Sequence, residues 1–228
     1  LNCFIKFFEN LCLLKCYNRP MLHLHKNYFF IFSFIFFSIF IRSDEDPYLF
    51  IDKNAQKMVQ VLTNDSDLFE LNRTVYEDKI KEIFEPMIDF RRVAASVMGK
   101  KYYLLASKNQ RAEFVLIFKD SLLDTYAETL AQWGDSTITT IYPKSELYLD
   151  IKNVEVKQTL DTGNSQYPIS YKLRKSDEGW KIVNIIINGV NLGLTFRNQF
   201  QALAISYDEN IELTLKNWVS DAGDAGIS

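Results

Sequence analysis

The chain has 228 residues, of which 26 are basic, 29 acidic, three cysteine and two histidine. All five Cys and His residues lie within positions 3–25, so residues 44–228 contain neither type. That part therefore cannot build a Ser-His-Asp triad, a Cys-His dyad, a zinc site with the usual ligands or a disulfide. Its 21 basic and 28 acidic residues give a net charge of −7, which disfavours nucleic acid as a partner.

Residues 1–43 are expected to be a leader. Positions 1–20 precede the first methionine and are interpreted as upstream mistranslation, whereas residues 21–43 have the pattern of a secretory signal peptide. The almost entirely apolar run at 28–41 is shorter than the roughly 20 residues that span a bilayer as a helix. We expect export to the periplasm and cleavage near Ser43. Because the residues around Ser43 make a poor cleavage site, a retained membrane anchor stays an alternative.

The domain that follows, residues 44–228, begins with apolar residues at the helical period. The pattern predicts one helix from Pro47 to about Leu62, interrupted by the polar residues 64–67. A second helix is predicted from about Asn72 to Met87. A short third helix is predicted from Asp89 or Phe90 to Met98, and Gly99 stands where a left-handed cap would end it.

The longest predicted helix runs from about Lys108 to Trp133. Ser107 and Gln110 have the spacing of a capping box at its start, and Gly134 would end it. The sequence at 114–118, FVLIF, is apolar on every side, so this turn must be covered all round. Its apolar stripe contains Phe114, Phe118, Leu122, Tyr126 and Leu130.

The second half of the domain favours strands. Four strands are predicted at 137–142, 145–160, 167–174 and 180–188, separated by turn residues. Asn188-Gly189 marks a turn, after which helices are predicted from about Asn191 and from Asp208 to Trp218. The order predicts an α+β fold in which a curved antiparallel sheet of about four to five strands packs against several helices, like an NTF2-like sheet with an added helical subdomain.

Few residues have the pattern of a catalytic site. Asp120 and Asp124 share a helix face and Glu146 and Asp150 share a strand face, but such carboxylate pairs are common on surfaces, and no phosphate-binding loop is present. We therefore expect no enzyme. The surplus of Phe and Tyr has two interpretations: a closed core, or a cavity for an apolar ligand.

Five stretches in chain order resemble the MlaC family, the periplasmic phospholipid-binding component of an ABC-type lipid transport system linked to toluene tolerance. The most specific is GWKIVNIIINGVNLGLTFRNQF at 179–200. The others are Asp46-Pro47-Tyr48, FEPMIDF at 84–90, VMGK at 97–100, and Ser107 with Gln110-Arg111 and 114–118.

The resemblance implies a carrier that shuttles glycerophospholipid between membranes and maintains outer-membrane lipid asymmetry. Its partners would be an outer-membrane lipoprotein–porin complex and an inner-membrane ABC transporter complex with a substrate-binding ring protein. No cofactor is implied beyond the bound phospholipid. Two alternatives stay open: an NTF2-like module that binds or converts a smaller apolar ligand, and a membrane-anchored interaction domain. The residues expected to line the acyl-chain cavity are Leu62, Phe84, Phe90, Val97, Phe114, Phe118, Leu122, Tyr171, Ile185, Ile187, Val190, Leu194, Phe196 and Phe200.

Overall fold

The computed structural model describes residues 45–131, 136–144 and 151–220. The contacts divide the chain into residues 1–43 and 44–228, and every described residue belongs to the second unit. This unit is an α+β domain, as predicted. Its helices are α3 (Pro47–Asn64), α4 (Ser66–Leu71), α5 (Arg73–Phe84), the 3₁₀ helix η1 (Glu85–Met87), α6 (Phe90–Leu105), α7 (Lys108–Ala131), α8 (Leu192–Ser206) and α9 (Ile211–Lys216).

Five antiparallel strands form one open sheet in chain order, which confirms the predicted sheet type. Each strand pairs with the strand that follows it in the sequence, the arrangement that turn-linked antiparallel strands favour. Residues 145–150, predicted to begin the second strand, lie outside the described residues. The strands are β1 (Thr137–Ile141), β2 (Asn153–Asp161), β3 (Gln166–Ser176), β4 (Gly179–Ile187) and β5 (Val190–Asn191).

The predicted turn at Asn188-Gly189 connects β4 to β5. Both residues have positive φ, 49° and 83°, and the flanking Ile187 and Val190 form a strand pair. Two residues with positive φ make the tight hairpin turn that Asn-Gly favours. The turn reverses the chain directly into α8, whose first turn is capped by the side chain of Asn191 accepting a hydrogen bond from Leu194 N.

The capping box at the start of α7 is also confirmed. Ser107 N donates to Gln110 Oε1 over 2.9 Å, and Gln110 N donates to Ser107 Oγ over 3.2 Å. These two bonds satisfy backbone donors that a helix start leaves free. The last predicted residues of this helix and Gly134 lie outside the described residues.

Three helix boundaries differ from the predictions. The predicted break is limited to Asp65, because α4 forms directly after it. Leu68 and Phe69 of α4 are partly buried, but its six residues are too few to show a helical period. Gly99 has the expected positive φ of 68°, but α6 only kinks there and continues to Leu105. The last helix begins at Ile211 and not at Asp208, because Asp208 has a φ of 51° and Asn210 is the capping residue.

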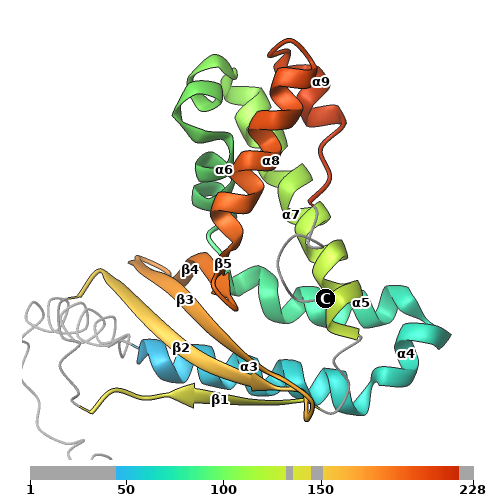
Figure 1. The fold of residues 1–228 in the computed structure, drawn as a ribbon, viewed down its shortest axis with the longest axis vertical. Helices are drawn as coiled ribbons and strands as arrows, with labels where there is room; N and C mark the ends of the chain where they lie inside the picture. The colour runs from blue at the N-terminus through green and yellow to red at the C-terminus, as the bar shows by residue number, and fades with distance from the viewer. Residues whose placement is uncertain (1–44, 132–135, 145–150, 221–228) are drawn as a thin grey trace, which may run out of the picture. The chain divides into compact units, whose positions relative to one another are not determined.

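The helices enclose the sheet's apolar face from two directions (Figure 1). α3 packs along β1 and β2, whereas α6 and α8 pack against β4 and lead away from it, with α7 beside α5, α6 and α9. Three clusters of buried side chains result. The first joins α6–α9 to the sheet, the second lies between α3 and the sheet around Trp180, and the third joins α3, α5 and α7 around Tyr76.

Tyr76 allows a prediction about stability. Its side chain is buried, its hydroxyl has no hydrogen-bond partner in the described part of the chain, and burial raises its pKa to about 12. At pH 8 we expect Tyr76→Phe to leave the free energy of unfolding unchanged or raise it by about 1 kcal/mol, because a buried unpaired hydroxyl is costly. The unfolded tyrosine ionises near pH 10, so the wild type should lose stability as pH rises from about 10 to 12, and the variant less.

Urea unfolding at pH 8 and pH 11 measures both effects. Tyr207→Phe is the control, because the Tyr207 side chain is only partly buried. A Tyr76→Phe variant clearly less stable than the wild type at pH 8 would mean that the hydroxyl is hydrogen-bonded.

Candidate functional site: an apolar cavity between helices and sheet

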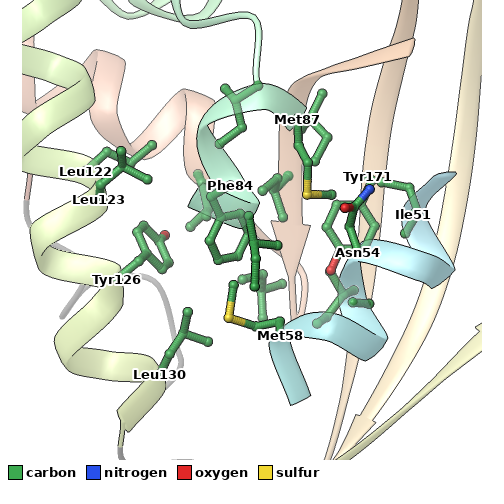
Figure 2. A pocket seen from close by; sticks show the side chains of 18 of the residues that line it. Ile51, Asn54, Met58, Phe84, Met87, Leu122, Leu123, Tyr126, Leu130 and Tyr171 are labelled. Carbon is green, nitrogen blue, oxygen red and sulfur yellow. The ribbon is translucent and has the colours of Figure 1, made fainter. Parts of the chain in front are cut away.

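An apolar cavity lies where the three core clusters meet. Phe84, at the end of α5, packs against all three clusters. Figure 2 shows Phe84 between Tyr126 of α7 and Met58 of α3, with Met87 of η1 beside it. The helices approach the sheet from two directions, and the cavity lies between them and the sheet.

None of the described residues that line the cavity is charged. Besides the small residues Ala55 and Gly193, the wall consists of large apolar side chains. Four of its side chains carry a polar group: Asn54, Tyr126, Tyr171 and Asn184. Such a wall favours an apolar ligand over water or an ion. The lining residues are Ile51, Asn54, Ala55, Met58, Val59, Leu62, Ile83, Phe84, Met87, Ile88, Val93, Phe118, Leu122, Leu123, Tyr126, Leu130, Ile138, Leu160, Ile169, Tyr171, Ile182, Asn184, Ile185, Ile187, Leu192, Gly193 and Phe196.

The cavity volume is about 130 Å³, and the free space rises to about 1180 Å³ when the part open to solvent is included. An apolar cavity of roughly 150 Å³ holds a molecule the size of benzene. The cavity is therefore narrow in this conformation, and it lies in a larger recess that is partly open to solvent.

The polar groups of the wall are neutral at physiological pH. Burial raises the pKa of both Tyr126 and Tyr171 above that of a free tyrosine. The Tyr126 hydroxyl has no hydrogen-bond partner among the described residues. Asn54 Nδ2 donates to Phe50 O of its own helix over 2.8 Å. No group in the described part of this wall is suited to exchange a proton near pH 7.

Phe118 occupies the boundary between the cavity and the first core cluster. It lines the cavity, but its side chain has no exposed surface. Its ring centroid lies 5.7 Å from that of Phe196, 5.9 Å from Phe114 and 6.3 Å from Trp218. The Phe118 side chain therefore belongs both to the cavity wall and to the aromatic core.

Eight of the predicted site residues line the cavity: Leu62, Phe84, Phe118, Leu122, Tyr171, Ile185, Ile187 and Phe196. That they contact lipid stays a prediction. The other six lie elsewhere. Phe90, Val97, Phe114 and Phe200 are buried in the first core cluster, Val190 packs at its margin, and Leu194 is 51% exposed.

Several lining residues were not among the predicted site residues, although the sequence carried a signal for them. Ile51, Met58 and Ile83 lie on the apolar stripes of the first two predicted helices. Tyr126 and Leu130 continue the stripe of α7. Periodicity identified these faces as buried, and only the three-dimensional arrangement shows that they face a cavity.

Only the first of the two carboxylate pairs lies within the described residues. Asp124 forms an ion pair with Lys81 over 2.8 Å on the surface, and Glu146 and Asp150 lie outside the described residues. Within the described ranges there is no group of three or more His, Cys, Asp or Glu side chains that could hold a metal ion. Likewise, no helix in those ranges is long and apolar enough to span a bilayer.

Fold and site together define an α+β domain with an uncharged cavity enclosed by a five-stranded sheet and helices. A profile of the MlaC protein family matches residues 52–218. The chain belongs to the MlaC family, as the sequence resemblance predicted.

Two curated relatives agree with this assignment. The chain is 26% identical over 183 residues to the toluene tolerance protein ttg2D of Pseudomonas putida, a match that covers 79% of this chain and 83% of the relative. It is 21% identical over 211 residues to the intermembrane phospholipid transport system binding protein MlaC of Haemophilus influenzae, covering 89% and 88%.

A solved structure has the same fold. It is the phospholipid-binding protein from Ralstonia solanacearum in complex with a phospholipid. The TM-score is 0.67 at 24% sequence identity, and the match covers 75% of this chain and 94% of that one.

Proposed function

We propose that this protein is a phospholipid carrier that holds the acyl chains of one glycerophospholipid in the cavity. The observation that supports the proposal is the wall itself, which is apolar and uncharged in a chain of the MlaC family. The relative from Haemophilus influenzae is an intermembrane phospholipid transport protein, and the Ralstonia solanacearum structure contains a phospholipid.

The energetics of lipid transfer require deep burial. Two chains of about 16 carbons carry roughly 25 kcal/mol of transfer free energy at ~0.8 kcal/mol per CH₂. A carrier that competes with a bilayer must bury nearly all of this surface, so the narrow enclosed part of the cavity has to widen on loading. Met58 and Met87 are suited to such a wall, because unbranched methionine side chains adapt to different shapes.

The carrier would work in the periplasm after export by the leader. We propose that it exchanges lipid with an outer-membrane lipoprotein–porin complex and with an inner-membrane ABC transporter complex and its substrate-binding ring protein, and so maintains outer-membrane lipid asymmetry. We also propose that it is a carrier and not an enzyme; the match to the MlaC family supports this, and the described lining residues have no group that would move a proton at neutral pH.

The enclosed volume favours one alternative. A space of about 130 Å³ suits a smaller apolar ligand of the kind that an NTF2-like module would hold. The carrier proposal predicts a phospholipid in the purified protein, whereas the alternative predicts a smaller apolar ligand.

The test is mass spectrometry of organic extracts. Residues 44–228, expressed in bacteria and purified without detergent, should carry about one phospholipid per protein molecule, with varied head groups because the chains supply most of the affinity. A non-binding protein purified from the same cells gives the background. A folded protein that contains no lipid and takes none from vesicles would contradict the proposal, and a smaller apolar ligand in the extract would support the alternative.

A further inference from the structure

A second hollow, of about 240 Å³, adjoins the acyl-chain cavity. Val93, Asn184 and Gly193 belong to the walls of both. Unlike the cavity, the hollow has a mixed wall, to which Ser96, Asn191 and Arg197 contribute polar groups and Val183 and Leu194 apolar ones. It therefore places polar groups, one of them charged, beside the uncharged wall of the cavity.

Arg197 is the charged residue of this hollow, and it is held in place. Its Nε donates to Ser96 O over 2.7 Å, and its Nη2 donates to Ser96 Oγ over 2.9 Å. Neither acceptor carries a charge, and Arg197 forms no ion pair with any described residue. Because the guanidinium is fixed and has no carboxylate partner among the described residues, an anion can bind to its charge and to the N–H donors of Nη1.

The wall that the hollow shares with the cavity is fixed by a small hydrogen-bond network. Asn184 Nδ2 donates to Asn191 Oδ1 over 3.0 Å, and Gly193 N donates to Asn184 Oδ1 over 3.0 Å. A Cβ on Gly193 would lie 2.5 Å from Asn184 Oδ1, so only glycine fits here without moving the asparagine. This glycine therefore allows Asn184 to keep its position in the shared wall.

We propose that the hollow receives the phosphate of the lipid whose acyl chains occupy the cavity, with Arg197 as its counter-charge. This inference rests on the proposed carrier function. Chains and phosphate are covalently linked, and an uncharged wall cannot hold the phosphate, so the phosphate must lie just outside the cavity. Arginine recognises phosphate through several directed donors. Because every glycerophospholipid has this phosphate, such a site selects the lipid class and tolerates different head groups.

The test compares two lipids that differ in the phosphate. The full chain, processed by the cell and purified, is incubated with phosphatidylcholine vesicles that contain equal minor amounts of phosphatidylethanolamine and of diacylglycerol with identical chains. The protein is re-isolated and its lipids are quantified by mass spectrometry. We expect the wild type to favour phosphatidylethanolamine over diacylglycerol about tenfold, the size of one charge-assisted contact. Arg197→Gln should reduce this preference to near one.

The matched control is Arg174→Gln, which removes the same charge from an exposed arginine of β3; its preference should equal that of the wild type. Arg197→Lys keeps the charge but lacks the paired N–H donors of the guanidinium, so it should retain part of the preference. It is the variant to measure if thermal unfolding shows that Arg197→Gln is not folded. Lipid-free protein is also titrated with inorganic phosphate, for which we expect weak binding that Arg197→Gln abolishes.

The outcomes separate the two proposals. An unchanged preference in the folded Arg197 variant overturns the phosphate site while leaving the carrier function intact. If Arg197→Gln abolishes the binding of inorganic phosphate but not the lipid preference, the hollow is an anion site unrelated to lipid, and the inference is also overturned. A wild type that takes up neither lipid removes the carrier function itself.

Discussion

Phe118→Asp is expected to unfold the domain. The side chain is completely buried and packs against Phe114, Phe196 and Trp218, so the variant loses those ring contacts and buries a carboxylate without a partner. Truncating a buried Phe alone costs about 3–5 kcal/mol, and an unpaired charge adds to it, whereas a domain has about 5–15 kcal/mol in total. Thermal unfolding followed by circular dichroism measures the effect.

Leu116→Asp on the same helix is the control, because Leu116 is 59% exposed and should tolerate a charge. The sequence alone predicts that Phe118 faces an open ligand cavity, so that Phe118→Asp would stay folded but fail to bind lipid. A folded Phe118→Asp protein with a near-normal melting temperature would therefore show that water reaches this side chain through the cavity.

Ala55→Phe is expected to remove most lipid binding while the domain stays folded. Ala55 lies on α3 and lines the cavity without being fully buried, so a larger side chain has free space in front of it. The added ring would displace about two to three methylenes of ligand, at ~0.8 kcal/mol each, and weaken binding roughly tenfold to a hundredfold. Lipid per protein after purification, and uptake from vesicles, are the measurements.

Ala112→Phe serves as the control, because this alanine is exposed on α7 and the same substitution there changes no cavity. Unfolding temperatures of both variants should stay close to that of the wild type. If Ala55→Phe carried a normal amount of lipid, the acyl chains would have to lie elsewhere in the domain.

The elements with strong local signals could be predicted from the sequence. Asn188-Gly189 specifies a tight turn by its backbone preference, and Ser107 with Gln110 specifies a helix start by hydrogen bonding. α4 could not be predicted, because its six residues are too few to show a helical period. The late start of α9 depends on left-handed conformations at Asp208 and Glu209. The sequence gives no signal for these conformations, because neither residue is a glycine.

The site could be predicted only in part, and Phe196 and Phe200 show why. They lie one turn apart on the same stripe of α8, and both are buried. Phe196 lines the cavity, whereas the Phe200 ring packs 4.9 Å from Phe114 and 5.7 Å from Trp218. Periodicity separates inside from outside, but it cannot separate closed core from cavity wall, because that depends on what faces the side chain from distant parts of the chain.

The wall described above also bears on how the proposed carrier would release its lipid. In the described part of that wall the titratable groups are two tyrosines whose pKa values burial raises, so acidification below neutral pH changes no charge there. If the cavity holds acyl chains as proposed, we expect the amount of lipid per protein to stay the same when the pH falls from neutral to mildly acidic. Release would then depend on a partner that moves the helices away from the sheet.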